Sequence, residues 1–249
     1  MMFRRTYNEL LQVGGLWQTS YELYPHLGGL ARQDTFEWRF PSGAQIKCSH
    51  MQHETDRFTW KGAQIALLEF DQLEGFTANQ FWFLLTCLRS LTPRVAPFVR
   101  AGANPVPEDD EIGGWLHRLV QWWVDPMTGW SIPERSGVLR WFVRADDDVI
   151  EWGDEPVSLQ NRHGKVPMSL TFIPGRLEDN AILERRDPAY RGVIMNMPRV
   201  ERERALGNWN VRPTAGSVFD RAWFEVVDAA PAVARRVRYW DKASLEGAG

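Results

Sequence analysis

The stretch QIALLEFDQLEGFT contains the residue with the clearest potential for chemistry, Asp71. A mostly apolar run from Ile65 to Phe70 predicts a buried strand that ends directly on this carboxylate. A carboxylate at the end of a buried strand is unfavourable unless a cation meets it. Because open α/β sheets collect their ligands at the carboxyl ends of the strands, the pattern predicts that Asp71 holds a hydrated Mg²⁺ that binds nucleotide phosphates.

The residue after Asp71 limits what such a site could do. A water-activating glutamate is common at this position, and the chain has Gln72 instead. A glutamine amide can orient water by hydrogen bonds, but it cannot accept a proton as a carboxylate does. Glu69 and Glu74 are candidate substitutes: Glu69 shares strand parity with Asp71, whereas Glu74 lies beyond the strand. The competing interpretation is that Asp71 is a solvated acid at a strand end.

The segments around this strand predict a parallel α/β sheet. Residues 34–51 alternate apolar and polar side chains about a Pro-Ser-Gly turn, which predicts a β-hairpin. Thr77 and Gln80 have the spacing of a capping box, so we expect a helix from about Thr77 to Arg89. RVAPFVRAGANP then reads as a second buried strand, and two strands flanking one helix favour a parallel arrangement. From Trp130 onward we expect another hairpin, a strand and a helical stretch.

The composition describes a chain that can fold but does not attract nucleic acid as a whole. Of its 249 residues, 44% are hydrophobic and 13 are tryptophan, which suffices for a large core. The net charge of −3 gives no general attraction to nucleic acid, although basic residues cluster toward the C-terminus. Two cysteines make no disulfide framework, so we expect buried, reduced thiols. There is no apolar window of about 18 residues and no signal peptide, so we expect a soluble, unexported protein without a membrane partner.

Two sets of side chains have both a nucleic-acid and a structural interpretation. Trp115, Trp122 and Trp123 could stack on bases, but their helical spacing favours packing on one face. On a strand, Arg4 and Arg5 point to opposite faces. At most one of them therefore contacts phosphate or DNA, and a plain salt bridge is an equal alternative.

Two further groups resemble metal ligands. Cys48, His50 and His53 have ligand chemistry, but they lack the second pair that a zinc site needs. Asp146 to Asp148 could also hold a metal ion, but their place at an expected hairpin tip favours a role in the turn.

Several motifs follow one another in a set order along the chain. They are FRRTYNELL, WRFPSGAQIKCSHM, DRFTWKGAQIALLEFDQLEGFT, LRSLTPRVAPFVRAGANP and GGWLHRLVQWWVD. This series resembles the ATPase region of the large terminase subunit of tailed bacteriophages. FIPGRLEDN and the residues up to RAWF resemble the segment that follows that region, and RRVRYWDKAS resembles the first strand of the family's RNase H-like nuclease domain. The resemblance covers nearly the whole chain.

The resemblance implies an α/β fold in three parts. Residues 1–128 would be a parallel-sheet P-loop NTPase core of the RecA/ASCE type, incomplete at its N-terminus. Residues 129–231 would be a smaller α+β linking subdomain, and residues 232–249 the first strand of a truncated nuclease domain.

The resemblance also implies a function and partners. The family uses ATP and Mg²⁺ to drive double-stranded DNA into a procapsid and cuts concatemers with its nuclease. Its implied partners are the portal protein of the procapsid and the small terminase subunit. The complete protein would act as a homo-oligomeric ring in the host cytoplasm.

Individual roles carry over to five positions. Asp71 would be the Walker B ligand of Mg²⁺, and Gln72 stands where the catalytic glutamate belongs. Asn104 falls on the coupling motif and would sense the γ-phosphate. Arg4 belongs to the F-R-R-T strand and would contact phosphate, and Asp241 would be a metal ligand of the nuclease.

The chain departs from the family at its phosphate loop. The pattern G-x-x-x-x-G-K-[ST] is absent from the sequence, and the family carries it upstream of the strand that here begins at Phe3. Asp241 is the one nuclease acid present, so we expect an internal piece of a longer protein that is inactive in isolation. The alternatives are a degenerate prophage remnant, a non-catalytic DNA-binding protein, and a fragment of another P-loop ATPase or helicase.

Overall fold

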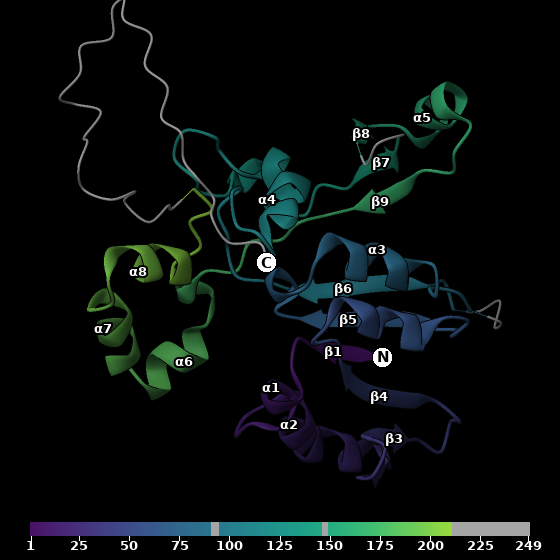
Figure 1. Ribbon diagram of the computed structural model, residues 1–249. Coiled ribbons are helices and arrows are strands. Elements are labelled where there is room, and N and C mark those ends of the chain that lie inside the picture. The colour runs from purple at the N-terminus through teal and green to yellow at the C-terminus, as the bar shows by residue number, and fades with distance from the viewer. Residues whose placement is uncertain (91–94, 146–148, 211–249) are drawn as a thin grey trace, which may run out of the picture. The chain divides into compact units, whose positions relative to one another are not determined.

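A six-stranded sheet carries the first half of the chain (Figure 1). The computed structural model describes residues 1–90, 95–145 and 149–210, which belong to one unit of the chain, Met1–Pro213. In sheet order the strands are β2 (Leu30–Arg32), β3 (Glu37–Arg39), β4 (Gln45–His50), β1 (Met2–Arg4), β5 (Leu67–Asp71) and β6 (Phe98–Gly102).

The pairing within this sheet confirms the predicted α/β class. Strands β4, β1, β5 and β6 run parallel to one another, whereas β2, β3 and β4 are joined antiparallel. The hairpin expected over residues 34–51 is the β3–β4 pair, in which Trp38 lies opposite Ile46. Its tight turn contains Gly43 at φ 84°, a left-handed conformation that glycine adopts without strain.

β1 is only three residues long, yet it is central to the sheet. Phe3 is fully buried, and its ring contacts Phe70 of β5 and Trp60, with centroids 5.8 and 5.2 Å away. Phe3 packs in the main core and Met2 against the second apolar cluster, so both faces of β1 are covered, as is usual for a strand with a parallel neighbour on each edge. The main core continues from there through Leu68 and Phe76 to Trp115.

Helices connect the strands. They are α1 (Tyr7–Leu11), α2 (Leu16–Leu23), α3 (Ala78–Leu85), α4 (Gly114–Val120), α5 (Pro156–His163), α6 (Ala181–Arg186), α7 (Ala189–Met195) and α8 (Arg199–Ala205). Short 3-10 helices are η1 (Tyr24–Leu27), η2 (Glu54–Trp60), η3 (Leu73–Gly75), η4 (Gln121–Trp123), η5 (Pro133–Arg135) and η7 (Leu177–Asp179).

The helix after β5 begins as predicted and ends early. Thr77 caps α3, and its hydroxyl and the Gln80 side chain form the expected capping box. The predicted continuation to Arg89 is wrong, because the helix stops at Leu85. Leu88 instead forms a parallel bridge with Ile65, so pairing beside β5 replaces the last helical turn.

The positions of Trp115, Trp122 and Trp123 confirm that these side chains pack within the protein. Trp115 and Trp123 are buried in the main core. Trp122 is partly buried, and the guanidinium groups of Arg135 and Arg140 lie 4.7 and 4.6 Å from its ring centre. Both arginines contact this ring by cation–π interactions, which makes Trp122 part of the protein's own packing.

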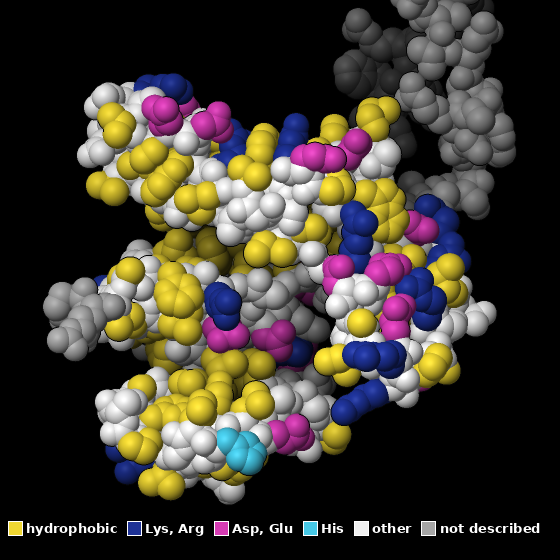
Figure 2. Space-filling view, turned by 180° about the vertical axis from the view of Figure 1, so that it is seen from behind, with side chains coloured by type: hydrophobic (Ala, Val, Ile, Leu, Met, Phe, Trp, Pro, Cys, Tyr) yellow, Lys and Arg dark blue, Asp and Glu magenta, His cyan; other side chains and the backbone are white. Residues whose placement is uncertain are grey.

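The described residues after 129 form a second, smaller sheet and four α-helices, α5 to α8. Strands β7 (Arg140–Arg144), β8 (Ile150–Gly153) and β9 (Met168–Leu170) pair antiparallel, which confirms the expected hairpin, while the tip at 146–148 lies outside the described residues. The expected helical stretch is divided into α7 and α8 at Pro198, which has extended backbone. Figure 2 shows basic and acidic side chains mixed on the surface of α6–α8.

The two cysteines are buried. Cys48 of β4 is buried in a second core cluster with Trp38 of β3, and Cys87 lies in the main core. Burial raises the pKa of the Cys48 thiol to about 11. At neutral pH this thiol is therefore protonated as well as shielded, and the predicted inert character of both cysteines follows from their burial.

Neither thiol of the folded protein should react with a thiol-specific disulfide reagent at about pH 8, because reaction requires an exposed thiolate. Both should react at once after denaturation, as followed by absorbance of the released thiolate. Cys48→Ala and Cys87→Ala variants assign the signals. Rapid modification of the native chain at either position would contradict the burial described here.

Candidate functional site at the carboxyl ends of the parallel strands

The parallel strands bring four of the five predicted site residues to one edge of the sheet. β1 ends at Arg4, β5 ends at Asp71, and Gln72 follows directly. β5 and β6 pair in register with Asp71 opposite Gly102, so Asn104 follows two residues beyond the same edge. The fifth residue, Asp241, lies outside the described residues.

Arg4 is the cation that meets Asp71. Its Nε donates a hydrogen bond to Asp71 Oδ2 over 2.6 Å, and its Nη1 donates to Gln72 Oε1 over 2.7 Å. The Arg4 side chain is 12% exposed and that of Asp71 is 32% exposed. Because a guanidinium group only donates, the oxygen of Gln72 must face Arg4. The amide NH₂ of Gln72 remains as a donor for other partners.

Gln72 has an unusual backbone conformation. Its φ of 61° and ψ of 62° are left-handed, and Phe36 is the only other described non-glycine residue with positive φ. Such a conformation costs on the order of 1 kcal/mol for a residue with a Cβ atom. It persists here because the side chain bonds to Arg4 and the Gln72 carbonyl accepts from Gly75 N. Strained residues of this kind are common in functional sites.

The side chain of Asn104 is hydrogen-bonded to Glu74, one of the two candidate substitutes for the glutamate that Gln72 replaces. Its Nδ2 donates to Glu74 Oε1 over 2.8 Å, while Glu74 Oε2 is buried without a hydrogen-bond partner. The next residue is also tied, because Arg204 of α8 donates from Nε to the Pro105 carbonyl over 2.9 Å. The role of Arg204 was not predicted, since 99 residues separate the two partners and no motif links them.

Glu69 lies beside the start of β1, away from the strand ends where Arg4 and Asp71 meet. Its backbone N–H bonds to the carbonyl of Met1, and it lies opposite Met2 in the sheet. Its negative charge contributes to raising the pKa of the Cys48 thiol, after the larger effect of burial. Strand parity with Asp71 therefore does not bring Glu69 to the edge where Arg4 and Gln72 meet.

The donor set at this edge does not fit a divalent cation as it is arranged. Asp71 supplies one carboxylate, and Arg4 already compensates its charge. Among the described residues, no three His, Cys, Asp or Glu side chains gather closely enough to hold a metal ion. Metal binding would therefore need a rearrangement of Arg4.

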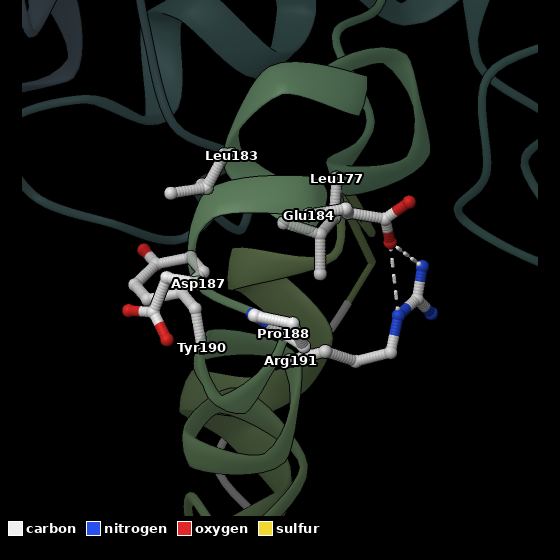
Figure 3. Close-up of a pocket in the computed structure, with 7 residues that line it drawn as sticks. All are labelled: Leu177, Leu183, Glu184, Asp187, Pro188, Tyr190 and Arg191. Carbon is white, nitrogen blue, oxygen red and sulfur yellow. Dashed lines mark hydrogen bonds and ion pairs between the residues drawn. The ribbon is translucent and has the colours of Figure 1, made fainter.

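Two cavities in the described part of the chain lie away from this edge of the sheet. A cavity of about 300 Å³ lies beside α6 and α7, and Glu184 on its lining pairs with the guanidinium of Arg191 over 2.5 Å (Figure 3). A second, of about 470 Å³, is lined by Glu151, Arg162 and other residues next to β8 and α5. Neither of these cavities is lined by a residue of the strand-end site.

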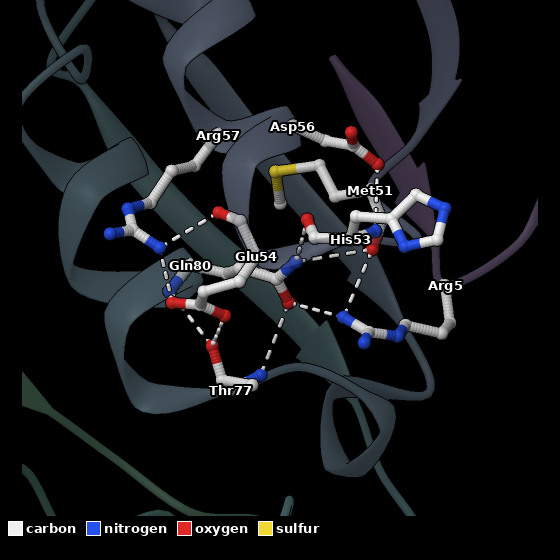
Figure 4. Close-up of polar contacts among 8 residues, drawn as sticks. All are labelled: Arg5, Met51, His53, Glu54, Asp56, Arg57, Thr77 and Gln80. Carbon is white, nitrogen blue, oxygen red and sulfur yellow. Dashed lines mark hydrogen bonds and ion pairs between the residues drawn. The ribbon is translucent and has the colours of Figure 1, made fainter. Parts of the chain in front are cut away.

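A buried polar network supports the site from the side of α3 (Figure 4). Gln80 is fully buried and donates from Nε2 to the carbonyls of Met51 and His53, at 3.2 and 2.9 Å. Its Oε1 accepts from Arg5 Nη1 over 2.5 Å and from Thr77 N over 3.2 Å. Arg5 thus fixes the chain directly after β1, which in turn holds Arg4 in place.

No family model, curated protein or solved structure matches this chain. No helix within the described part of the chain has both the length and the apolar character needed to cross a membrane.

Gln80→Ala should lower the free energy of unfolding by about 2–3 kcal/mol, because it removes a fully buried amide together with its hydrogen bonds to Met51 O, His53 O and Arg5. Chemical denaturation measures the change. Asn79→Ala is the matched control: this neighbouring residue is exposed, and its replacement should change stability by less than about 0.5 kcal/mol. Equal effects of the two substitutions would contradict a structural role for Gln80.

Asp71→Asn should lower the free energy of unfolding by about 1–2 kcal/mol, between the values for surface and buried pairs, because Arg4 loses its counter-charge. Asp154→Asn is the control. Asp154 is 87% exposed and its pair with Arg140 is 3.3 Å long, so less than about 0.5 kcal/mol is expected. Chemical denaturation measures both variants. If both substitutions lowered the free energy of unfolding by the same small amount, the Arg4–Asp71 pair would behave as a surface ion pair.

Proposed function

We propose that this chain is part of the large terminase subunit of a tailed bacteriophage. In this proposal the parallel sheet is the P-loop NTPase core, residues 129–231 are the linking subdomain, and residues 232–249 begin the RNase H-like nuclease with Asp241. The complete protein couples ATP hydrolysis to the movement of double-stranded DNA into a procapsid in the host cytoplasm. The portal protein and the small terminase subunit are its partners, and it acts as a homo-oligomeric ring.

The proposal rests on one observation, the shared edge of β1, β5 and β6. The ordered motifs assign roles at Arg4, Asp71, Gln72 and Asn104, which are far apart in sequence. Parallel pairing of adjacent strands brings the ends of all three strands to the same side of the sheet. Nucleotide sites of α/β proteins occur at such edges, which supports the nucleotide-binding interpretation.

The outer edge of β6 also supports it. Among the described strands, β6 pairs only with β5, and Phe98 is 48% exposed. Parallel strands are normally covered on both faces and paired on both sides. A further strand beside β6, leading into the phosphate loop that this sequence lacks, would complete the sheet.

A non-catalytic role in DNA binding, in a degenerate prophage protein, is the second candidate. It is favoured by Gln72, which cannot accept a proton, and by the ion pair that neutralises Asp71. In either case the 249-residue chain is expected to lack ATPase activity by itself.

The chain alone should bind Mg·ATP more weakly than about 1 mM, the upper end of usual enzyme KM values, because its sequence contains no G-x-x-x-x-G-K-[ST] motif to hold the phosphates. Isothermal titration calorimetry measures this. The coding DNA upstream of Met1 should contain an in-frame G-x-x-x-x-G-K-[ST], and the extended protein should bind ATP. Replacing the loop lysine with alanine is its control.

Two results would contradict the proposal. One is micromolar ATP binding by the 249-residue chain, and the other is an extended protein in which the loop lysine and Asp71 can both be replaced without loss of ATP binding.

A further inference from the structure

The cavity beside α6 and α7 has a carboxylate on its lining that no described group neutralises. We infer that this cavity is a docking site for a lysine or arginine side chain, presented by a partner polypeptide within an apolar segment. The inference is independent of the proposed function, because no residue of the strand-end site lines this cavity.

The lining of the cavity combines apolar and charged side chains. Two leucines and a proline line it together with the ring of Tyr190. Asp187 and Tyr190 lie on one side of the cavity, and the Glu184–Arg191 pair lies on the other (Figure 3). The volume of about 300 Å³ is at the lower end for ligand sites, so it suits one side chain better than a large cofactor. A long side chain with an apolar stem and a charged end matches this lining.

Asp187 supplies the uncompensated charge. Two carboxylates and one guanidinium group line the cavity, so the lining has a net charge of −1. The guanidinium is already engaged, because Arg191 Nη2 donates to Glu184 Oε1 over 2.5 Å and to Glu178 Oε1 over 3.2 Å. Within the described residues, no hydrogen bond or ion pair reaches the carboxylate of Asp187. A cation from another molecule would complete the site.

The backbone fixes Asp187 at the junction of the two helices. Its N–H donates to the carbonyl of Leu183 over 2.8 Å at the end of α6, and its own carbonyl accepts from Tyr190 N over 3.1 Å. Pro188 follows and restricts the conformation of Asp187 further. The carboxylate and the aromatic ring are therefore held close together. Ammonium and guanidinium groups bind to carboxylates by charge-assisted hydrogen bonds and to aromatic rings by cation–π contacts.

The surface next to the cavity favours a polypeptide over a free amine. Val193 lies one helical turn beyond Tyr190 on α7, and the two residues are 57% and 40% exposed. Exposed apolar side chains beside a cavity can be covered by the residues that flank a docked cation. Nucleic acids and anionic lipids carry negative charge, so the acidic lining disfavours them.

The first test follows the binding of a rhodamine-labelled peptide, Gly-Ala-Leu-Lys-Leu-Ala amide, by fluorescence anisotropy. Asp187→Asn should weaken binding about three- to fivefold, the effect of losing one partly exposed ion pair. Glu201→Gln is the matched control, because it removes one carboxylate from an exposed position of α8 outside the cavity and should leave the affinity unchanged. Added salt should weaken binding to the unmodified chain more than binding to Asp187→Asn, since salt screens the ion pair.

The second test separates the ring from the carboxylate. Tyr190→Leu should weaken binding of the lysine peptide about two- to fivefold, whereas Tyr190→Phe, which keeps an aromatic face, should bind within about twofold of the unmodified chain. The same peptide with glutamine in place of lysine should bind about fivefold more weakly, because it lacks the charge. n-Butylamine should displace the lysine peptide only at a large excess, because it lacks the flanking apolar residues.

The inference is overturned if the unmodified chain does not bind the lysine peptide, or if the glutamine peptide binds equally well. Equal effects of Asp187→Asn and Glu201→Gln would also overturn it, because the peptide would then not bind at the cavity. Displacement of the peptide by an equal concentration of n-butylamine would make a free amine the ligand and defeat docking of a polypeptide. Self-association of the chain that Asp187→Asn weakens, measured by analytical ultracentrifugation, would support the inference and identify a second copy as the partner.

Discussion

The ion pair between Arg4 and Asp71 is the interaction on which the strand-end site depends. It joins the last residues of β1 and β5, two strands that are adjacent in the sheet but 67 residues apart in sequence. A carboxylate at the end of a buried strand requires a cation, and here the neighbouring strand supplies it. The same guanidinium also holds Gln72, so one side chain determines the charge of the edge and the direction of its amide.

The rest of the unit keeps this pair in register. Phe3 and Phe70 lie opposite each other in the pairing of β1 and β5, and their buried, stacked rings favour the register that brings Arg4 beside Asp71. On the α3 side, the buried Gln80 network fixes Arg5 and the start of the helix. A buried amide with all of its hydrogen bonds made is directional in a way that apolar packing is not. Burial therefore supplies stability, and the network supplies alignment.

Local features of the fold could be predicted from the sequence, and features made by distant partners could not. The Thr77 cap and the β3–β4 hairpin depend on residues a few positions apart, and both were predicted. The early end of α3 depends on the pairing of Leu88 with Ile65, which no local pattern reveals. For the site, the sequence identified Asp71 and left Arg4 between two roles, because the choice depends on the register of β1 and β5. The left-handed backbone of Gln72 has no local signal such as glycine.

The hydrogen bond from Arg204 to the Pro105 carbonyl gives the unit a mechanical connection. Asn104 is held by Glu74 on one side, and the next residue is held by a side chain of α8 on the other. The backbone at Asn104 and Pro105 therefore links the end of β6 to α8. Asn208 and Trp209, just beyond α8, also bond to the backbone at Thr128 and Gly129. A displacement of α8 would therefore have to stretch or break the hydrogen bond at Pro105, the residue next to Asn104.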